Sequence, residues 1–130
     1  MREIKFRAWD KRHKIMSFVT QIHFDQKSRQ VATEQISWLN MDTLMQFTGL
    51  LDKNGKEIYE GDVVKMYLLD SSPIPLELKV PVFFYEGVFN VATLNNDPLS
   101  LRDAITLSNK AKQGAEVIGN IYENKDLLKG

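Results

Sequence analysis

The chain has 130 residues, of which 43% are hydrophobic, and its 17 Lys and Arg equal its 17 Asp and Glu. This length supports one hydrophobic core, so we expect a single domain over residues 1–130, and the zero net charge excludes an overall field that steers the protein to nucleic acid or an acidic membrane. The chain has no cysteine, which fits a reducing compartment. It also has no apolar run that could span a bilayer, and its charged start is unlike a signal peptide, so we expect it in the cytoplasm.

The N-terminal residues alternate between apolar and basic side chains. Ile4, Phe6 and Ala8 alternate with Lys5 and Arg7, which is the period of a strand with one buried face. The chain then predicts a charged turn, two short strands and an exposed loop, over residues 10–14, 15–19, 21–24 and 25–30.

The middle of the chain is marked by two glycine turns. Residues 31–51 fit neither a helical nor a strand period, and we expect short strands there with a turn at 40–42. Asn54-Gly55 predicts a type I′ hairpin, because both central residues of that turn need positive φ. Glu60-Gly61-Asp62 predicts a second turn, which leads into a core strand over residues 63–69.

Prolines punctuate the next segment. Pro73 and Pro75 keep residues 70–75 out of regular structure. Strands over residues 76–85 and 88–93 meet at Glu86-Gly87 and predict a hairpin. Pro81 within the first of these strands predicts an edge position or a bulge.

One helix is predicted near the C-terminus. Asn96 or Asp97 caps it, Pro98 is its first residue, and Leu101, Ala104 and Ile105 follow at helical spacing. Residues 116–122 return to a strand, and residues 124–128 close with a short capped turn. The fold class is therefore mainly β (β-rich α+β), with antiparallel strands in a small SH3-like or partly open barrel and one or two short helices.

No pattern of catalytic or metal-binding residues stands out. His13 and His23 are the two histidines, and His23 with Asp25 would supply only two ligands on one strand face, so a surface or core histidine is favoured. Asp52 to Lys56 lacks the ligand spacing of an EF-hand, and Glu57, Glu60 and Asp62 are more typical of a solvated turn. No glycine-rich phosphate loop occurs. We therefore assign no catalytic, cofactor or metal residues.

Charge is unevenly distributed along the chain. Residues 1–40 carry eight Lys or Arg against four Asp or Glu, and residues 41–130 carry nine against thirteen. Basic and aromatic residues interleave at the start, which is typical of surfaces that bind single-stranded nucleic acid. The alternative is that Phe6 is core, Lys5 and Arg7 form its solvated face, and Trp9 packs partly under a loop. The candidate nucleic-acid-binding residues are Arg2, Lys5, Arg7, Trp9, Lys11, Arg12 and Lys14.

Three stretches resemble the YopX family. They are MREIKFRAWD at residues 1–10, LMQFTGLLDKNGKEIYEGDVVK at 44–65 and EVIGNIYEN at 116–124. The resemblance implies a phage or prophage gene, often of Gram-positive bacteria, and a predominantly β fold, and it supplies no catalytic residues. The signature itself consists of turn glycines and core residues, which describes a scaffold.

We therefore expect a non-catalytic binding or interaction module in the cytoplasm of the bacterial host, with a host or phage protein as its partner. One alternative is a nucleic-acid-binding β domain in phage replication or regulation. A small enzyme of unrecognised type is ranked last. Because the two ends of the chain carry opposite charge, they could also pair between subunits of a homo-oligomer.

Overall fold

The computed structural model describes residues 3–24, 29–35, 38–69, 73–93 and 97–128. The chain divides into two compact units, Met1–Phe47 and Thr48–Gly130. Strand β5 (Leu44–Leu51) belongs to both, because its first residues pair with β1 in the first unit and it continues to β6 in the second. The expectation of one domain over residues 1–130 stays a prediction.

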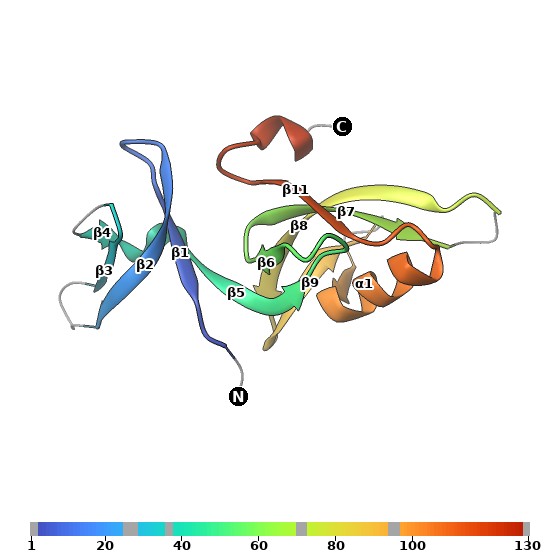
Figure 1. Cartoon of the computed structure of the whole chain (residues 1–130), viewed down its shortest axis with the longest axis horizontal. Helices are drawn as coiled ribbons and strands as arrows, with labels where there is room; N and C mark the ends of the chain where they lie inside the picture. The colour runs from blue at the N-terminus through green and yellow to red at the C-terminus, as the bar shows by residue number, and fades with distance from the viewer. Residues whose placement is uncertain (1–2, 25–28, 36–37, 70–72, 94–96, 129–130) are drawn as a thin grey trace. The chain divides into compact units, whose positions relative to one another are not determined.

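The first unit is an antiparallel sheet with strand order β4-β3-β2-β1-β5 (Figure 1). The predicted first strand is confirmed over Phe6–Asp10, where Ala8 and Asp10 are buried on one face. Ile4, which was expected on the buried face, precedes the strand and is exposed, and the chain turns at residues 11–14. Phe6, which was expected in the core, is only half-buried. The elements before β5 are β1 (Phe6–Asp10), β2 (Ile15–Phe24), β3 (Arg29–Thr33), β4 (Leu39–Asn40) and the 3-10 helix η1 (Met41–Thr43).

Strand β2 joins the two short strands that the sequence predicted into one strand of 10 residues. Its register shifts between Val19 and Gln21, so a β-bulge stands where the sequence suggested a break. Residues up to Phe18 pair with β1, and those from Val19 onward pair with β3. Of the predicted loop over residues 25–30, residues 25–28 lie outside the described residues, while Arg29 and Gln30 belong to β3.

The second unit holds a five-stranded antiparallel sheet with order β10-β9-β8-β7-β11, and helix α1 packs against β7, β9 and β10 (Figure 1). Its core is a cluster of buried side chains: Ile58, Val64, Met66, Val82, Val91, Leu101, Ala104, Ala115 and Val117. The elements are β6 (Glu57–Tyr59), β7 (Asp62–Leu68), β8 (Leu76–Tyr85), β9 (Val88–Ala92), β10 (Pro98–Ser100), α1 (Leu101–Lys110), β11 (Glu116–Asn120) and η2 (Lys125–Leu128).

The type I′ turn is at Glu86-Gly87, where φ is 49° and 82°. At the predicted position, Gly55 has φ of 81° and Asn54 is not among the described residues with positive φ. The prediction of a type I′ turn at Asn54-Gly55 is therefore wrong, although a hairpin does form there. Its loop has a single left-handed residue because Asp52 accepts amide bonds from inside it, as described below.

The helix begins later than the sequence predicted. Its N-cap is Ser100, whose hydroxyl accepts a hydrogen bond of 3.1 Å from the amide of Asp103. Pro98 lies in β10 opposite Ala92, so pairing with β9 takes the residues that were assigned to the first helical turn. The proposed cap Asn96 lies outside the described residues. The helical spacing itself is confirmed, since Leu101 and Ala104 are buried.

Strand β8 lies between β7 and β9 in the sheet, but in the described registers each part of it pairs with one neighbour, so Pro81 lies at a local edge and not on an outer strand. The strand changes partner at this residue. Residues 76–81 pair with β7, and residues 82–85 pair with β9. A proline is tolerated here because it lies at the switch, outside a continuous two-sided ladder.

The mainly β, antiparallel fold with short helices is confirmed. In the described part of the chain the strands lie in two sheets that do not close into a barrel. The same residues contain no helix that is long and apolar enough to cross a membrane.

Candidate functional site

The end of β1 and the 3-10 helix η1 border a pocket of about 220 Å³ in the first unit. Three of the predicted nucleic-acid-binding residues, Trp9, Lys11 and Arg12, line one wall of this pocket. The opposite wall comes from a segment some thirty residues further along the chain. The lining residues are Trp9, Asp10, Lys11, Arg12, Leu39, Asn40, Asp42 and Thr43.

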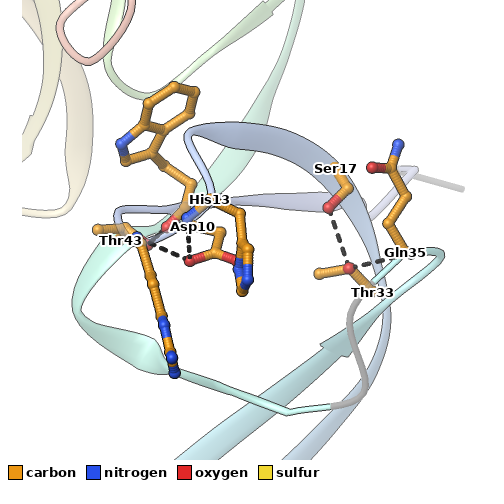
Figure 2. A network of polar contacts seen from close by, with 8 residues as sticks. Asp10, His13, Ser17, Thr33, Gln35 and Thr43 are labelled. Carbon is orange, nitrogen blue, oxygen red and sulfur yellow. Dashed lines mark hydrogen bonds and ion pairs between the residues drawn. The ribbon is translucent and has the colours of Figure 1, made fainter.

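Asp10 fixes the shape of the turn beside the pocket (Figure 2). One carboxylate oxygen accepts hydrogen bonds from the amides of Arg12 (2.9 Å) and His13 (3.3 Å), and the other lies 2.6 Å from Nδ1 of His13. Burial would raise the pKa of Asp10, but the bonds from His13 and Arg12 outweigh it and hold this pKa below 3.8. The ionised carboxylate therefore organises a turn whose Lys11 and Arg12 side chains are exposed.

A second contact ties the other wall of the pocket to β1. The hydroxyl of Thr43, a buried residue, donates to the carbonyl of Trp9. Within the same wall, the side-chain oxygen of Asn40 accepts a bond of 3.1 Å from the amide of Asp42. The pocket is thus shaped by bonds that do not use the basic side chains at its rim.

Two buried hydroxyls lie further along the sheet (Figure 2). Ser17 donates a hydrogen bond of 3.0 Å to the hydroxyl of Thr33, which also accepts one of 3.3 Å from the amide of Gln35. Ser17 donates to a hydroxyl, whereas the serine of an activated nucleophile donates to a base such as an imidazole. Its role is to join β2 to β3.

The other predicted basic residues lie in a second group. Arg7 is opposite Phe18 on β2 and Met45 on β5, and Trp9 is opposite Met16, so Lys5, Arg7 and Trp9 share one face of β1. The ammonium of Lys5 lies 3.1 Å from Glu3 and 5.1 Å from the ring centroid of Phe47. Lys14 is exposed at the end of the turn, with φ of 57°. Arg2 lies outside the described residues.

A second groove in the first unit was not foreseen from the sequence. It has a volume of about 330 Å³ and opens where β2 turns from β1 toward β3. The bulge after Val19 creates the divergence, and the only sequence signal for it was the interrupted alternation at Thr20. The lining residues are Ile4, Lys5, Phe6, Phe18, Val19, Thr20, Gln21 and Ile22.

Two acidic residues of the 44–65 block, Asp52 and Asp62, are structural. Asp52 accepts amide bonds from Asn54 (2.8 Å), Lys56 (2.9 Å) and Val117 (3.0 Å). Burial would raise the pKa of Asp52, but these bonds outweigh it and lower this pKa below 3.8. Asp62 is 2% exposed and accepts the amide of Tyr59 at 2.8 Å, so the solvated turn predicted around it is wrong for this residue.

Possible metal ligands are dispersed. Within the described ranges, no group of three or more His, Asp or Glu side chains lies together in a way that could hold a metal ion. His23 makes an edge contact with Trp38, with ring centroids 6.1 Å apart. Its predicted companion Asp25 lies outside the described residues.

Comparison with known proteins agrees with the sequence resemblance. The family model described as YopX protein matches residues 5–129. The crystal structure of protein EF1440 from Enterococcus faecalis is similar, with a TM-score of 0.63 and 29% identity over 99% of this chain and 100% of that chain. No curated protein matches this chain.

Proposed function

Given that this chain belongs to the YopX family, we propose that it is a non-catalytic binding module, encoded by a phage or prophage and acting on a protein in the cytoplasm of the host. The supporting observation is how its buried carboxylates are used. Asp10, Asp52 and Asp62 all accept backbone amide bonds. Carboxylates committed in this way stabilise turns and are poorly suited to proton transfer.

The working surface of the proposed module is the pocket beside Trp9. Lys11 and Arg12 are exposed at its rim, and the turn that carries them is held by Asp10 and His13. A rigid turn loses little conformational entropy on binding, and aromatic and arginine side chains are enriched at the centres of protein interfaces.

A pull-down from cells that carry the phage tests the protein-binding proposal. The double substitution Lys11→Ala/Arg12→Ala is expected to abolish recovery of the partner. The matched double substitution Lys79→Ala/Lys125→Ala removes two exposed cations from the second unit and is expected to retain it. Equal recovery with both variants, or no partner with the unmodified chain, would refute the proposal.

Nucleic-acid binding is the second candidate, because the same pocket combines one indole with two cations. A base stacked on an aromatic ring contributes about 1–3 kcal/mol. Anisotropy titrations with single-stranded DNA and RNA test it. We expect Trp9→Ala to weaken binding, and Lys11→Ala/Arg12→Ala to make the slope of log K against log salt shallower by about 1.4, since each phosphate contact contributes about 0.7.

The Lys79→Ala/Lys125→Ala variant again serves as the control in these titrations and is expected to bind as the unmodified chain does. An unmodified chain that binds neither polymer at low salt would remove the nucleic-acid candidate and leave the protein partner.

A further inference from the structure

The hairpin tip of the second unit, residues 84–89, exposes large apolar side chains on both of its faces. Phe84, Tyr85 and Val88 are 54%, 51% and 49% exposed. Phe84 is opposite Phe89, and Tyr85 is opposite Val88, so the two pairs lie on opposite faces of the hairpin. The tip is an apolar wedge with one charged residue, Glu86.

The hairpin tip is internally braced. The side-chain amide of Asn90, a buried residue, donates to the carbonyls of Tyr85 (3.1 Å) and Val88 (2.9 Å). The rings of Phe84 and Phe89 pack edge to face, with centroids 5.2 Å apart. Glu86 occupies a left-handed conformation, with φ of 49°, that residues with a Cβ disfavour. A rigid tip that displays aromatic rings and retains a conformationally unfavourable glutamate is typical of a contact surface.

The β1–β2 groove of the first unit, lined by the eight residues given above, has complementary properties. Its lining side chains are mostly apolar, and Ile4 and Phe18 are 62% and 51% exposed. One wall comes from the chain that enters β1, and the other comes from β2 where it diverges. A wedge with two apolar faces can therefore meet apolar side chains on both walls.

The charges of the two surfaces are also complementary. The lining of the β1–β2 groove includes one cation, Lys5, and no acid, whereas residues 84–89 include one acid, Glu86, and no cation. Lys5 is half-buried and already contacts Glu3 at 3.1 Å, and a partly exposed pair of this kind is weak enough for a second carboxylate to join. Residues 1–47 carry eight cations against five acids, and residues 48–130 carry nine against twelve.

We propose that the hairpin tip of one copy of this chain inserts into the β1–β2 groove of a second copy. The contact is heterologous, so each copy offers one tip and one groove. Contacts between like surfaces are disfavoured, because two tips would oppose Glu86 with Glu86 and two grooves would oppose Lys5 with Lys5. The groove is distinct from the pocket beside Trp9, so the self-association does not depend on the proposed function.

Sedimentation velocity tests the contact. A small apolar interface, below about 1,200 Å² in total, falls in the weak range, so the full chain is examined from about 10 μM to about 1 mM. The average mass should rise with concentration. The tip variant Phe84→Ser/Tyr85→Ser and the groove variant Ile4→Ser/Phe18→Ser should each remain monomeric while keeping the circular dichroism spectrum of the unmodified chain. Ile74→Ser, which alters an exposed apolar residue elsewhere, should associate normally.

Mixing the variants distinguishes this arrangement from other modes of association. The tip variant retains a groove and the groove variant retains a tip, so an equimolar mixture should form a one-to-one dimer and nothing larger. Likewise, Lys5→Glu and Glu86→Lys should each weaken association at least tenfold. An equimolar mixture of the two should restore it, because each tip then meets a groove of opposite charge, and the double variant Lys5→Glu/Glu86→Lys should also restore it.

Three results would overturn the proposal. They are a monomer at every concentration, association that persists in both the tip and groove variants, and a variant mixture that stays monomeric.

Discussion

The carboxylate of Asp52 accepts a hydrogen bond of 3.0 Å from the backbone amide of Val117, 65 positions further along the chain. The other oxygen of the same carboxylate accepts the amides of Asn54 and Lys56. In addition, the amide of Lys53 donates to the carbonyl of Ala115 at 2.9 Å. The loop between β5 and β6 is therefore fastened to the start of β11, and two separate parts of the YopX signature meet at one acidic side chain.

Asp52→Asn should lower the free energy of unfolding by about 1–3 kcal/mol, the usual effect of leaving a buried hydrogen-bonding group without its partner. Asparagine can keep one acceptor for the loop amides, but its NH₂ group then faces the amide of Val117, which is also a donor. Urea unfolding followed by circular dichroism measures the change. Asp97→Asn, at an exposed position, is the control, and an equal effect of both substitutions would contradict the assigned role of Asp52.

Stability should fall in acid. Burial raises the pKa of Asp10 and of Asp52, but the hydrogen bonds they accept outweigh it and lower both below 3.8. A depressed folded-state pKa contributes stability that is fully present above the unfolded value and is lost as pH falls through the folded value. Urea midpoints measured from neutral pH downward should therefore drop below pH 3.8. The fall of the urea midpoint with pH should be shallower in Asp52→Asn. Midpoints that rise on acidification would contradict the prediction.

Glu86→Asn should raise stability by about 0.5–1 kcal/mol, because Asn-Gly suits a type I′ turn and asparagine tolerates positive φ better than glutamate does. Thermal unfolding at low protein concentration measures this effect apart from association. Glu86→Ala is the matched control, since it removes the same charge but lacks the short polar side chain that lets asparagine tolerate positive φ, and it should give no gain. Equal stabilisation by both substitutions would assign the effect to charge and not to the backbone.

Backbone amides should exchange with solvent at different rates in the two units. The cluster of buried residues that forms the main core lies in the second unit, on elements that include β7, α1 and β11. Amides protected by such a core open only with large-scale unfolding, whereas those in thinly covered strands open locally. Hydrogen-exchange mass spectrometry should therefore find slower exchange in β7 than in residues 19–24 of β2. Faster exchange in β7 would contradict this assignment of the core.

The sequence predicted the fold where the signal was local. The first strand, the turn at Gly61 and the helical spacing of Leu101 and Ala104 each depend on near neighbours, and all three are confirmed. The helix start was misplaced because Pro98 suits both a first helical turn and a strand. Pairing of β10 with β9, which is a long-range contact, decides between them.

The candidate site was predicted in part. Interleaved basic and aromatic residues pointed to Trp9, Lys11 and Arg12, and these three share a pocket. The opposite wall was not predictable, because the bond from Thr43 to Trp9 joins residues 34 positions apart. Asp10 was placed in a charged turn and Asp52 in a hairpin, with no structural role assigned to either carboxylate. The signal that was missed is that each of these residues is followed by a turn. Backbone amides two to four residues after the aspartate then lie within reach of its carboxylate.

Pro81 also bears on the solubility of the chain. In the described registers, residues 76–80 of β8 pair with β7 on one side and with no strand on the other. An open edge of this kind invites the backbone of a neighbouring molecule to extend the sheet, which is a common first step toward aggregation. Pro81 has no amide hydrogen to offer there, so it removes one backbone donor from this stretch. We therefore expect Pro81 to make the addition of a neighbouring strand along residues 76–80 less favourable.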